Sequence, residues 1–234
     1  MTTILPREVL DRINLRLLGN TPNLHYTDFF VSELCAHGVR GDMVECGVAA
    51  GCHPAVMALG LDVAEPGSDR KVYLLDSFQG IPRPGPKDIA IRGLLGEGNG
   101  ELISTGISAC SLLDVQRHMA EWGVPETRLR YLQGWFQDTV PVFRDMMRKW
   151  NQSISFLRLD GDLYESVKVC LAHLAPLVSI GGVIVLDDHH LDGAQAAAIE
   201  WASWVESARG WKPVFRDMEG CGGSVYVRVE APGA

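Results

Sequence analysis

Phe156-Leu157-Arg158-Leu159-Asp160-Gly161-Asp162 is a short apolar run that ends in paired acids, and Val183-Ile184-Val185-Leu186-Asp187-Asp188 repeats that pattern. Such a run is typical of a buried parallel strand, and in open α/β sheets the carboxyl ends of the strands face the ligand crevice. Two neighbouring strands would therefore bring these carboxylates into one small volume. Because clustered carboxylates repel one another, a hard cation such as Mg²⁺ is expected between them. The sequence thus predicts a divalent ion beside a ligand crevice.

Helix and strand patterns alternate along the rest of the chain. Two helices are expected first, at residues 6–19 and 27–38, the second with Thr27 as a candidate N-cap. Strands are expected at 43–46, 71–76, 128–133, 154–160, 183–187, 214–216 and 224–229, and further helices at 53–63, 111–122, 139–150, 166–175 and 194–208. This alternation predicts an α/β fold, a doubly wound sheet covered on both faces.

Composition and charge narrow the class of protein. The chain of 234 residues, 47% hydrophobic and 21% charged, can bury one sizeable core without disulfides. A formal net charge of −8, with no cluster of Lys and Arg, argues against a nucleic-acid partner. No apolar run approaches membrane-spanning length, and the first residues lack a signal-peptide pattern. The six cysteines have no CxxC spacing, which favours reduced thiols in a cytoplasmic protein.

A glycine-rich turn, Val44-Glu45-Cys46-Gly47-Val48-Ala49-Ala50-Gly51, lies between an expected strand and an expected helix. Its glycines let the backbone approach a ligand closely, and the helix that follows presents free amides. The spacing differs from the dinucleotide fingerprint, so a smaller nucleoside with a charged amino-acid tail fits better. Asp76 ends the next strand, where an acid commonly accepts hydrogen bonds from ribose hydroxyls. A purely structural strand–helix turn is the alternative, and Asp76 favours the nucleoside.

These residues carry a family resemblance. The turn at 45–51 resembles the first motif of class I S-adenosylmethionine-dependent methyltransferases. Four further motifs, in order, resemble the macrocin O-methyltransferase family: Leu75-Asp76-Ser77-Phe78-Gln79-Gly80-Ile81-Pro82, Gly134-Trp135-Phe136-Gln137-Asp138-Thr139-Val140-Pro141, Leu157-Arg158-Leu159-Asp160-Gly161-Asp162-Leu163-Tyr164-Glu165-Ser166 and Asp187-Asp188. The resemblance runs from about residue 40 to 190. The family commonly has Asp-Asp-Tyr where this chain has Asp187-Asp188-His189, so the acceptor pocket is where a difference is expected.

The resemblance implies a Rossmann-like class I methyltransferase fold with a seven-stranded, mostly parallel sheet. Residues 1–40 would form an N-terminal helical extension and 41–234 the methyltransferase domain, with a lid insertion over 80–110. The implied activity is metal-dependent transfer of a methyl group from S-adenosylmethionine to a hydroxyl, of a sugar above all, on a small secondary metabolite such as an antibiotic. A glycosylated acceptor, Mg²⁺ or a similar cation and a homo-oligomer are therefore expected.

Site residues follow from the same motifs by position. The implied metal ligands are Asp160, Asp187 and Asp188. The implied catalytic residues are Asp160, Asp162 and His189, with Asp162 or Asp160 taking the proton of the acceptor hydroxyl, and the implied cofactor-binding residues are Glu45, Gly47, Gly51, Asp76, Ser77 and Trp135. Simpler roles stay open: the acids at 160 and 162 could cap a solvated turn, and Trp135 could belong to the core.

Two other interpretations remain. An iron-using hydroxylase related to cephalosporin hydroxylase would need two histidines and one carboxylate, which His189 and His190 could supply. A non-catalytic nucleoside-binding module with a structural ion is the second. The expected lid rests on the many glycines and prolines between 80 and 110, and a plain surface insertion is its alternative.

Overall fold

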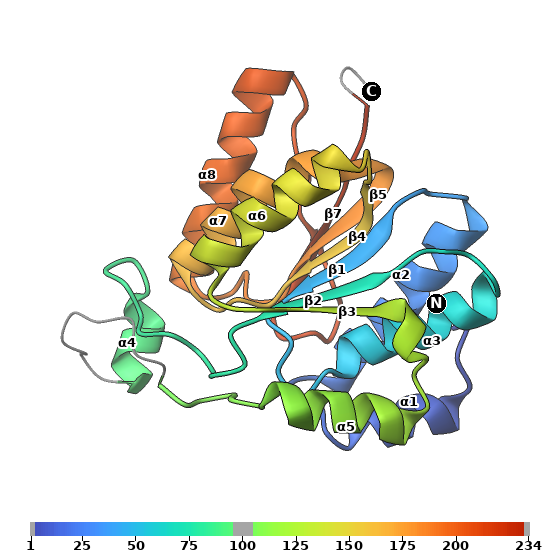
Figure 1. The fold of residues 1–234 in the computed structure, drawn as a ribbon. Coiled ribbons are helices and arrows are strands. Elements are labelled where there is room, and N and C mark those ends of the chain that lie inside the picture. The colour runs from blue at the N-terminus through green and yellow to red at the C-terminus, as the bar shows by residue number, and fades with distance from the viewer. Residues whose placement is uncertain (1–2, 96–104, 232–234) are drawn as a thin grey trace.

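A seven-stranded sheet runs through the centre of the molecule (Figure 1), in the order β3-β2-β1-β4-β5-β7-β6. The computed structural model describes residues 3–95 and 105–231. The strands are β1 (Asp42–Cys46), β2 (Val72–Asp76), β3 (Leu129–Gln133), β4 (Ile154–Leu159), β5 (Val178–Leu186), β6 (Arg216–Asp217) and β7 (Val225–Arg228). Strands β1 to β5 are parallel, whereas β7 pairs antiparallel with both β5 and β6. The prediction of a seven-stranded, mostly parallel sheet is confirmed.

Helices cover both faces of the sheet (Figure 1). One face carries α1 (Arg7–Asn14), α2 (Thr21–Ala36), α3 (Cys52–Ala64) and α5 (Leu112–Trp122). The other carries α6 (Phe136–Lys149), α7 (Tyr164–Leu174) and α8 (Asp192–Arg209). The short α4 (Ile89–Leu95) lies at the margin of this second layer, beside the start of α8, and 3₁₀ turns lie at Glu126–Arg128 and Ala175–Leu177.

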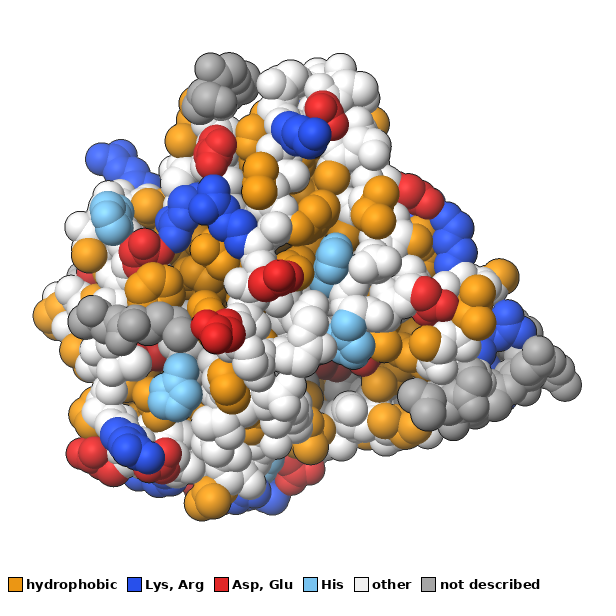
Figure 2. Space-filling model, turned by 180° about the vertical axis from the view of Figure 1, so that it is seen from behind, with side chains coloured by type: hydrophobic (Ala, Val, Ile, Leu, Met, Phe, Trp, Pro, Cys, Tyr) orange, Lys and Arg blue, Asp and Glu red, His pale blue; other side chains and the backbone are white. Residues whose placement is uncertain are grey.

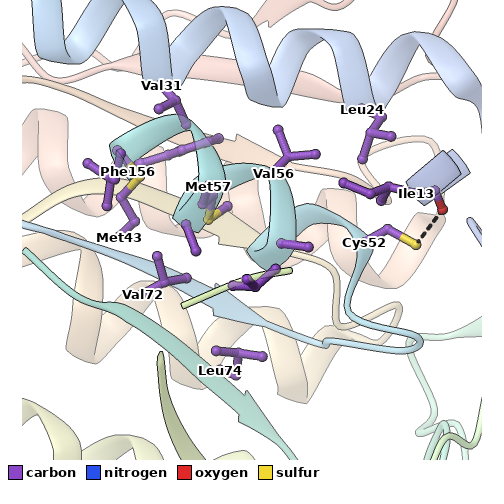
Figure 3. Packing of buried hydrophobic residues seen from close by; sticks show 14 of the residues in the cluster. Ile13, Leu24, Val31, Met43, Cys52, Val56, Met57, Val72, Leu74 and Phe156 are labelled. Atoms are coloured by element: carbon purple, nitrogen blue, oxygen red, sulfur yellow. Dashed lines mark hydrogen bonds between the residues drawn. The ribbon is translucent and has the colours of Figure 1, made fainter. Parts of the chain in front are cut away.

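The layer between the sheet and α2 explains the composition of α3. Val56 and Met57 of α3 are fully buried, between Val31 of α2 and side chains of the sheet such as Phe156 and Val72 (Figure 3). Burying one such side chain stabilises the fold by about 1.5–3 kcal/mol. Because α3 is covered on both sides, it has almost no polar face. This packing fixes the helix that begins directly after the glycine-rich turn.

Several predicted boundaries are wrong. The first helix ends at Asn14, not at 19, and the second begins at Thr21, with Asn20 as N-cap and a proline in its first turn. Thr27 therefore lies inside α2, where it is buried. Proline suits a first helical turn because its missing N–H would be unpaired there in any case. Strand β5 begins at Val178, earlier than predicted. The prediction was wrong because a Gly-Gly pair within the strand interrupts the apolar pattern.

Two observations concern the surface. Within the described ranges, no helix combines the length and the apolar character needed to cross a bilayer. Figure 2 shows small groups of basic side chains separated by acidic and apolar ones, with no broad basic face on that side of the molecule.

Candidate active site

A cavity of about 770 Å³ opens at the carboxyl ends of the parallel strands. Residues that follow β1, β2, β3, β4 and β5 all line it, among them Gly47, Ser77, Trp135, Asp162 and Asp188. The carboxyl edge of a doubly wound sheet is where such folds bind ligands. The two acid-ended runs therefore do meet at one crevice.

The glycine-rich turn after β1 packs closely against the backbone at the end of β4. Gly47 has φ +91°, and a Cβ there would come within 1.7 Å of the carbonyl oxygen of Asp160, the first residue after β4. Gly51 has φ +88° and is the N-cap of α3, with a φ that disfavours other residues. Gly47 lines the cavity, whereas Gly51 faces Met119 and Val115 of α5. Gly51 thus shapes the turn from behind.

Asp76, at the end of β2, holds this turn in place. Its Oδ2 accepts a hydrogen bond of 2.6 Å from the Val48 amide, and its Oδ1 accepts one of 2.6 Å from the Phe78 amide. Asp76 also lines the cavity beside Ser77, with Gly134 and Trp135 nearby along the wall. Each carboxylate oxygen can accept more than one hydrogen bond, so both remain able to bind hydroxyl donors in the cavity.

Three carboxylates converge in the same cavity. One oxygen each from Asp160, Asp187 and Asp188 can be chosen so that all three atoms lie within 4.8 Å of one another. The hydrogen bonds made within the described residues engage one oxygen of each side chain: Asp160 Oδ2 accepts from Arg158, Asp188 Oδ2 from the Asp162 amide, and Asp187 Oδ1 from Asn23, Ser224 and Arg158. The second oxygen of each is available to a ligand.

The acidic cluster is short of positive charge. Burial, together with the negative charge of Asp187, raises the pKa of Asp160 well above its ordinary value. Burial and the nearby Asp162 do the same to the pKa of Asp188. Burial and the charge of Asp160 raise the pKa of Asp162 to about 8. A hard divalent cation bound by oxygen ligands would relieve this repulsion, so the donor set fits Mg²⁺.

Glu45 does not reach the cavity. It is 1% exposed, and its Oε1 lies 3.0 Å from Nε of the buried Arg158. Desolvation raises the pKa of Glu45 well above the usual range, although Arg158 opposes the shift. The sequence analysis did not single out Arg158. A lone arginine inside an apolar strand is a usable signal, because a buried charge needs an ionised partner.

The two histidines after β5 have different environments. His190 lines the cavity. The ring of His189, in contrast, packs against Phe215 with 5.0 Å between centroids, and its Nε2 is buried without a hydrogen-bond partner in the described part of the chain. The structure thus brings together every other residue implied as catalytic or metal-binding, but it places His189 outside the cavity wall.

The segment expected to form a lid contributes to the cavity. This segment, residues 80–110, is called the excursion below. Gly80, Pro82 and Asp88 from its first part and Ser108 from its last part line the cavity. The base of the excursion is paired, because the Ile81 amide donates to the Ile107 carbonyl at 2.9 Å and the Thr105 amide donates to the Ile81 carbonyl at 2.8 Å. Among the glycines on which the predicted lid rests, Gly96, Gly98 and Gly100 lie outside the described residues.

The sequence analysis missed two further stretches of the wall. Leu18, Gly19 and Asn20, which precede α2, line the cavity. So do Cys221 and Gly222, from the turn between β6 and β7. Neither stretch carries a recognisable motif, and only the packing of α2 and the last hairpin against the sheet brings them there.

The sequence is similar to a known family and to several characterised O-methyltransferases. Residues 18–207 match the model of the macrocin-O-methyltransferase (TylF) family. An 8-demethyl-8-(2,3-dimethoxy-alpha-L-rhamnosyl)-tetracenomycin-C 4'-O-methyltransferase of Streptomyces olivaceus is 34% identical over 79% of this chain and 65% of its own length. A demethyldecarbamoylnovobiocin O-methyltransferase of Streptomyces niveus is 34% identical over 68% and 56%. A mycinamicin III 3''-O-methyltransferase of Micromonospora griseorubida is 32% identical over 73% and 64%. The chain thus matches less than two thirds of the length of these relatives.

Solved structures show the same fold. The O-methyltransferase NovP has a TM-score of 0.73 and 28% identity, covering 90% of this chain and 80% of that one. The calicheamicin methyltransferase CalS11 has a TM-score of 0.67 and 19% identity, covering 94% and 91%. TomG from Streptomyces achromogenes, solved with S-adenosylmethionine, has a TM-score of 0.60 and 13% identity, covering 97% and 92%. At such low identity, the last two speak for the fold alone, which is that of class I O-methyltransferases.

Proposed function

Because the chain belongs to the macrocin O-methyltransferase (TylF) family, we propose that it transfers a methyl group from S-adenosylmethionine to a hydroxyl of a small glycosylated metabolite. One observation carries the proposal: a glycine-rich turn braced by Asp76 and a cluster of three aspartates share one cavity. The first suits a nucleoside, and the second suits activation of a weakly acidic hydroxyl. The Streptomyces olivaceus relative, whose name includes a rhamnosyl group, supports the substrate class.

The proposed cofactor site is the end of the cavity beside Asp76. Gly47 admits the cofactor close to the backbone, and Trp135 forms an apolar wall. Asp76 accepts hydrogen bonds from the ribose hydroxyls, and the Ser77 hydroxyl can donate or accept them. Gly51 and Glu45 act indirectly, Gly51 through the shape of the turn and Glu45 through Arg158. The side chain of Glu45 is almost fully buried, so we assign it no direct contact with the cofactor.

The proposed metal site consists of Asp160, Asp187 and Asp188. A bound Mg²⁺ would supply Lewis acidity that lowers the pKa of the acceptor hydroxyl. Three converging carboxylates favour such a hard cation over iron, for which two histidines and one carboxylate are the usual ligands. The position of His189 against Phe215 therefore gives no support to the hydroxylase alternative.

Asp162 is the proposed general base. It lines the cavity, and its backbone amide is held by Asp188 at 2.9 Å, while its φ of +56° sets the direction of the turn. The reaction balances simply: the acceptor O–H gives its proton to Asp162, the C–O bond forms as the C–S bond of the sulfonium breaks, and S-adenosylhomocysteine leaves. We assign His190, rather than His189, to the acceptor side because it lines the cavity.

The excursion from 80 to 110 is the proposed lid over the acceptor. Its described parts line the cavity, and closure there would exclude water from the sulfonium. A reducing, cytoplasmic location suits the six cysteines, all of which are free thiols. A homo-oligomeric state stays a prediction from the sequence.

The function is tested by cofactor binding and by methyl transfer measured separately. Titration calorimetry should show S-adenosylmethionine binding to the wild-type chain, weakened in Asp76→Ala and unchanged in Asp11→Ala, a surface control on α1. With isotope-labelled cofactor and a panel of glycosides, mass spectrometry should detect label on a sugar oxygen. Asp162→Asn should slow transfer by about 10²–10⁴-fold without weakening cofactor binding. A wild-type chain that neither binds the cofactor nor labels any glycoside would refute the proposal.

A further inference from the structure

A buried arginine lies directly behind the acidic cluster. Arg158 is 2% exposed, and the parallel register places it opposite Glu45 of β1. Its Nη1 donates to Asp187 Oδ1 at 3.1 Å, and its Nη2 donates to Asp160 Oδ2 at 2.9 Å. One guanidinium therefore contacts two of the three carboxylates assigned to the ion, through one oxygen of each.

A histidine that the reaction does not use contacts the same guanidinium nitrogen that donates to Asp160. His53, in the first turn of α3, is 6% exposed, and its Nε2 lies 3.0 Å from Arg158 Nη2. An arginine can only donate hydrogen bonds, so Nε2 must accept and the proton of the ring must sit on Nδ1. Nδ1 lies 2.8 Å from Thr27 Oγ1, which donates in turn to the Asn23 carbonyl at 3.2 Å.

The donor and acceptor roles along this series of hydrogen bonds are therefore mutually consistent. Thr27 accepts from His53 and donates to Asn23, and His53 accepts from Arg158. Asn23 closes the loop, because its side-chain Nδ2 donates to Asp187 Oδ1 at 2.7 Å. Helices α2 and α3 are therefore tied to the acidic strand ends through buried polar contacts. Desolvation and the neighbouring Arg158 charge lower the pKa of His53 well below its ordinary value, which agrees with a neutral ring.

We propose that Arg158 is a positioning residue for the metal site and that His53, fixed as its Nδ1–H tautomer by Thr27, holds the guanidinium in the orientation that presents Asp160 and Asp187 to the ion. The inference rests on the metal site of the proposed function. Its physical basis is the planar fork of arginine, which orients two carboxylates at once, as a lysine ammonium does not. Partners one step behind the ligands set ligand orientation in the same way at other metal sites.

The matched pair His53→Leu and His53→Gln tests this role. Glutamine keeps an acceptor oxygen for Arg158, whereas leucine removes the acceptor of one Nη2 N–H and leaves Nη2 with its carboxylate contacts alone. Mn²⁺ serves as the probe because it takes oxygen ligands as Mg²⁺ does, and electron paramagnetic resonance counts the free ion. Without cofactor or acceptor, His53→Leu should weaken Mn²⁺ binding by about 10–100-fold. His53→Gln should bind Mn²⁺ nearly as the wild type does, and both should keep wild-type affinity for S-adenosylmethionine.

A second pair covers the case in which His53→Leu fails to fold. Thr27→Val removes the hydroxyl that fixes the tautomer, and Thr27→Ser keeps it, so only the former should weaken Mn²⁺ binding. Long-range ¹H–¹⁵N spectra of the wild type should show His53 protonated at Nδ1 alone. Wild-type Mn²⁺ affinity in His53→Leu and Thr27→Val, or an Nε2–H tautomer, would overturn the inference while leaving the metal site intact. A wild type that binds no Mn²⁺ would instead remove the metal site, and this inference with it.

Discussion

At the scale of single residues, backbone conformation and buried charge decide the site. Gly47 allows the turn after β1 to touch the backbone at Asp160, and this contact places the proposed cofactor end of the cavity beside the acidic end. The charge of Arg158 is retained in the core because burial, which alone would lower its pKa, is outweighed by the carboxylates of Asp187, Asp160 and Glu45, which raise it. A buried charge without such partners would cost far more than the fold could offset.

Gly47→Ala should lower the free energy of unfolding much more than the same substitution at a glycine with open space around it. Gly67 is the matched control, because its φ of +93° resembles the +91° of Gly47 but nothing lies within 4 Å of its added Cβ. Gly67→Ala should lower the free energy of unfolding by about 1–2 kcal/mol, the cost of a left-handed conformation. Gly47→Ala adds the clash with Asp160 and should cost about 2–6 kcal/mol. Urea unfolding measures both, and equal losses would contradict the close approach.

At the scale of elements, the start of α2 and the position of α4 matter most for the site. Because α2 begins at Thr21, Asn23 and Thr27 point from its first turns toward Asp187 and His53. The short α4 is tied down by acids at its start. Asp88 accepts from the Tyr164 amide at 2.7 Å, and Asp192 accepts from the Ile89 amide at 2.9 Å. These contacts dock the proposed lid on α7 and α8.

Asp88→Ala should loosen this segment. Asp88 is 2% exposed, and hydrogen bonds to a charged group contribute about 1.5–3 kcal/mol each. Trypsin should therefore cut after Lys87 and Arg92 at least ten times faster in the variant, because cleavage follows the population of the open form. Glu200→Gln is the control: it alters an exposed ion pair with Lys87, and such pairs contribute little. Equal cleavage of Asp88→Ala and wild type would show that Asp88 does not hold the segment.

At the scale of the whole molecule, the acidic strand ends cost stability when no cation is bound. An aspartate in the unfolded chain ionises near pH 3.9, whereas burial and like charges raise the pKa of Asp160 and Asp188 in the fold. The folded state then binds more protons than the unfolded state above that pH. The metal-free protein should therefore lose stability as the pH rises from about 4 toward neutrality.

Mg²⁺ should reverse this loss. At a concentration of one hundred times its dissociation constant, an ion that binds only the folded state adds about 2.7 kcal/mol to stability. The thermal midpoint of the wild type at neutral pH should rise with added Mg²⁺ and fall again with chelator. Asp188→Asn should be at least as stable as the wild type without the ion and should gain much less from it. A thermal midpoint of the wild type that does not change when Mg²⁺ is added would mean that the cluster binds no such ion.

The sequence by itself determined the class of fold and most of the segments that meet at the cavity. Apolar runs that end in acids, a glycine-rich turn and regular alternation are local patterns, and the carboxyl-edge rule of parallel sheets converts them into neighbours in space. Only the tertiary structure decided which side chains face the cavity. It turned His189 onto Phe215, buried Glu45 and brought Asn23 and His53 to the acidic cluster. These outcomes depend on how α2 and the last hairpin pack against the sheet. Because the contacting residues are far apart in sequence, no local sequence pattern indicates these contacts.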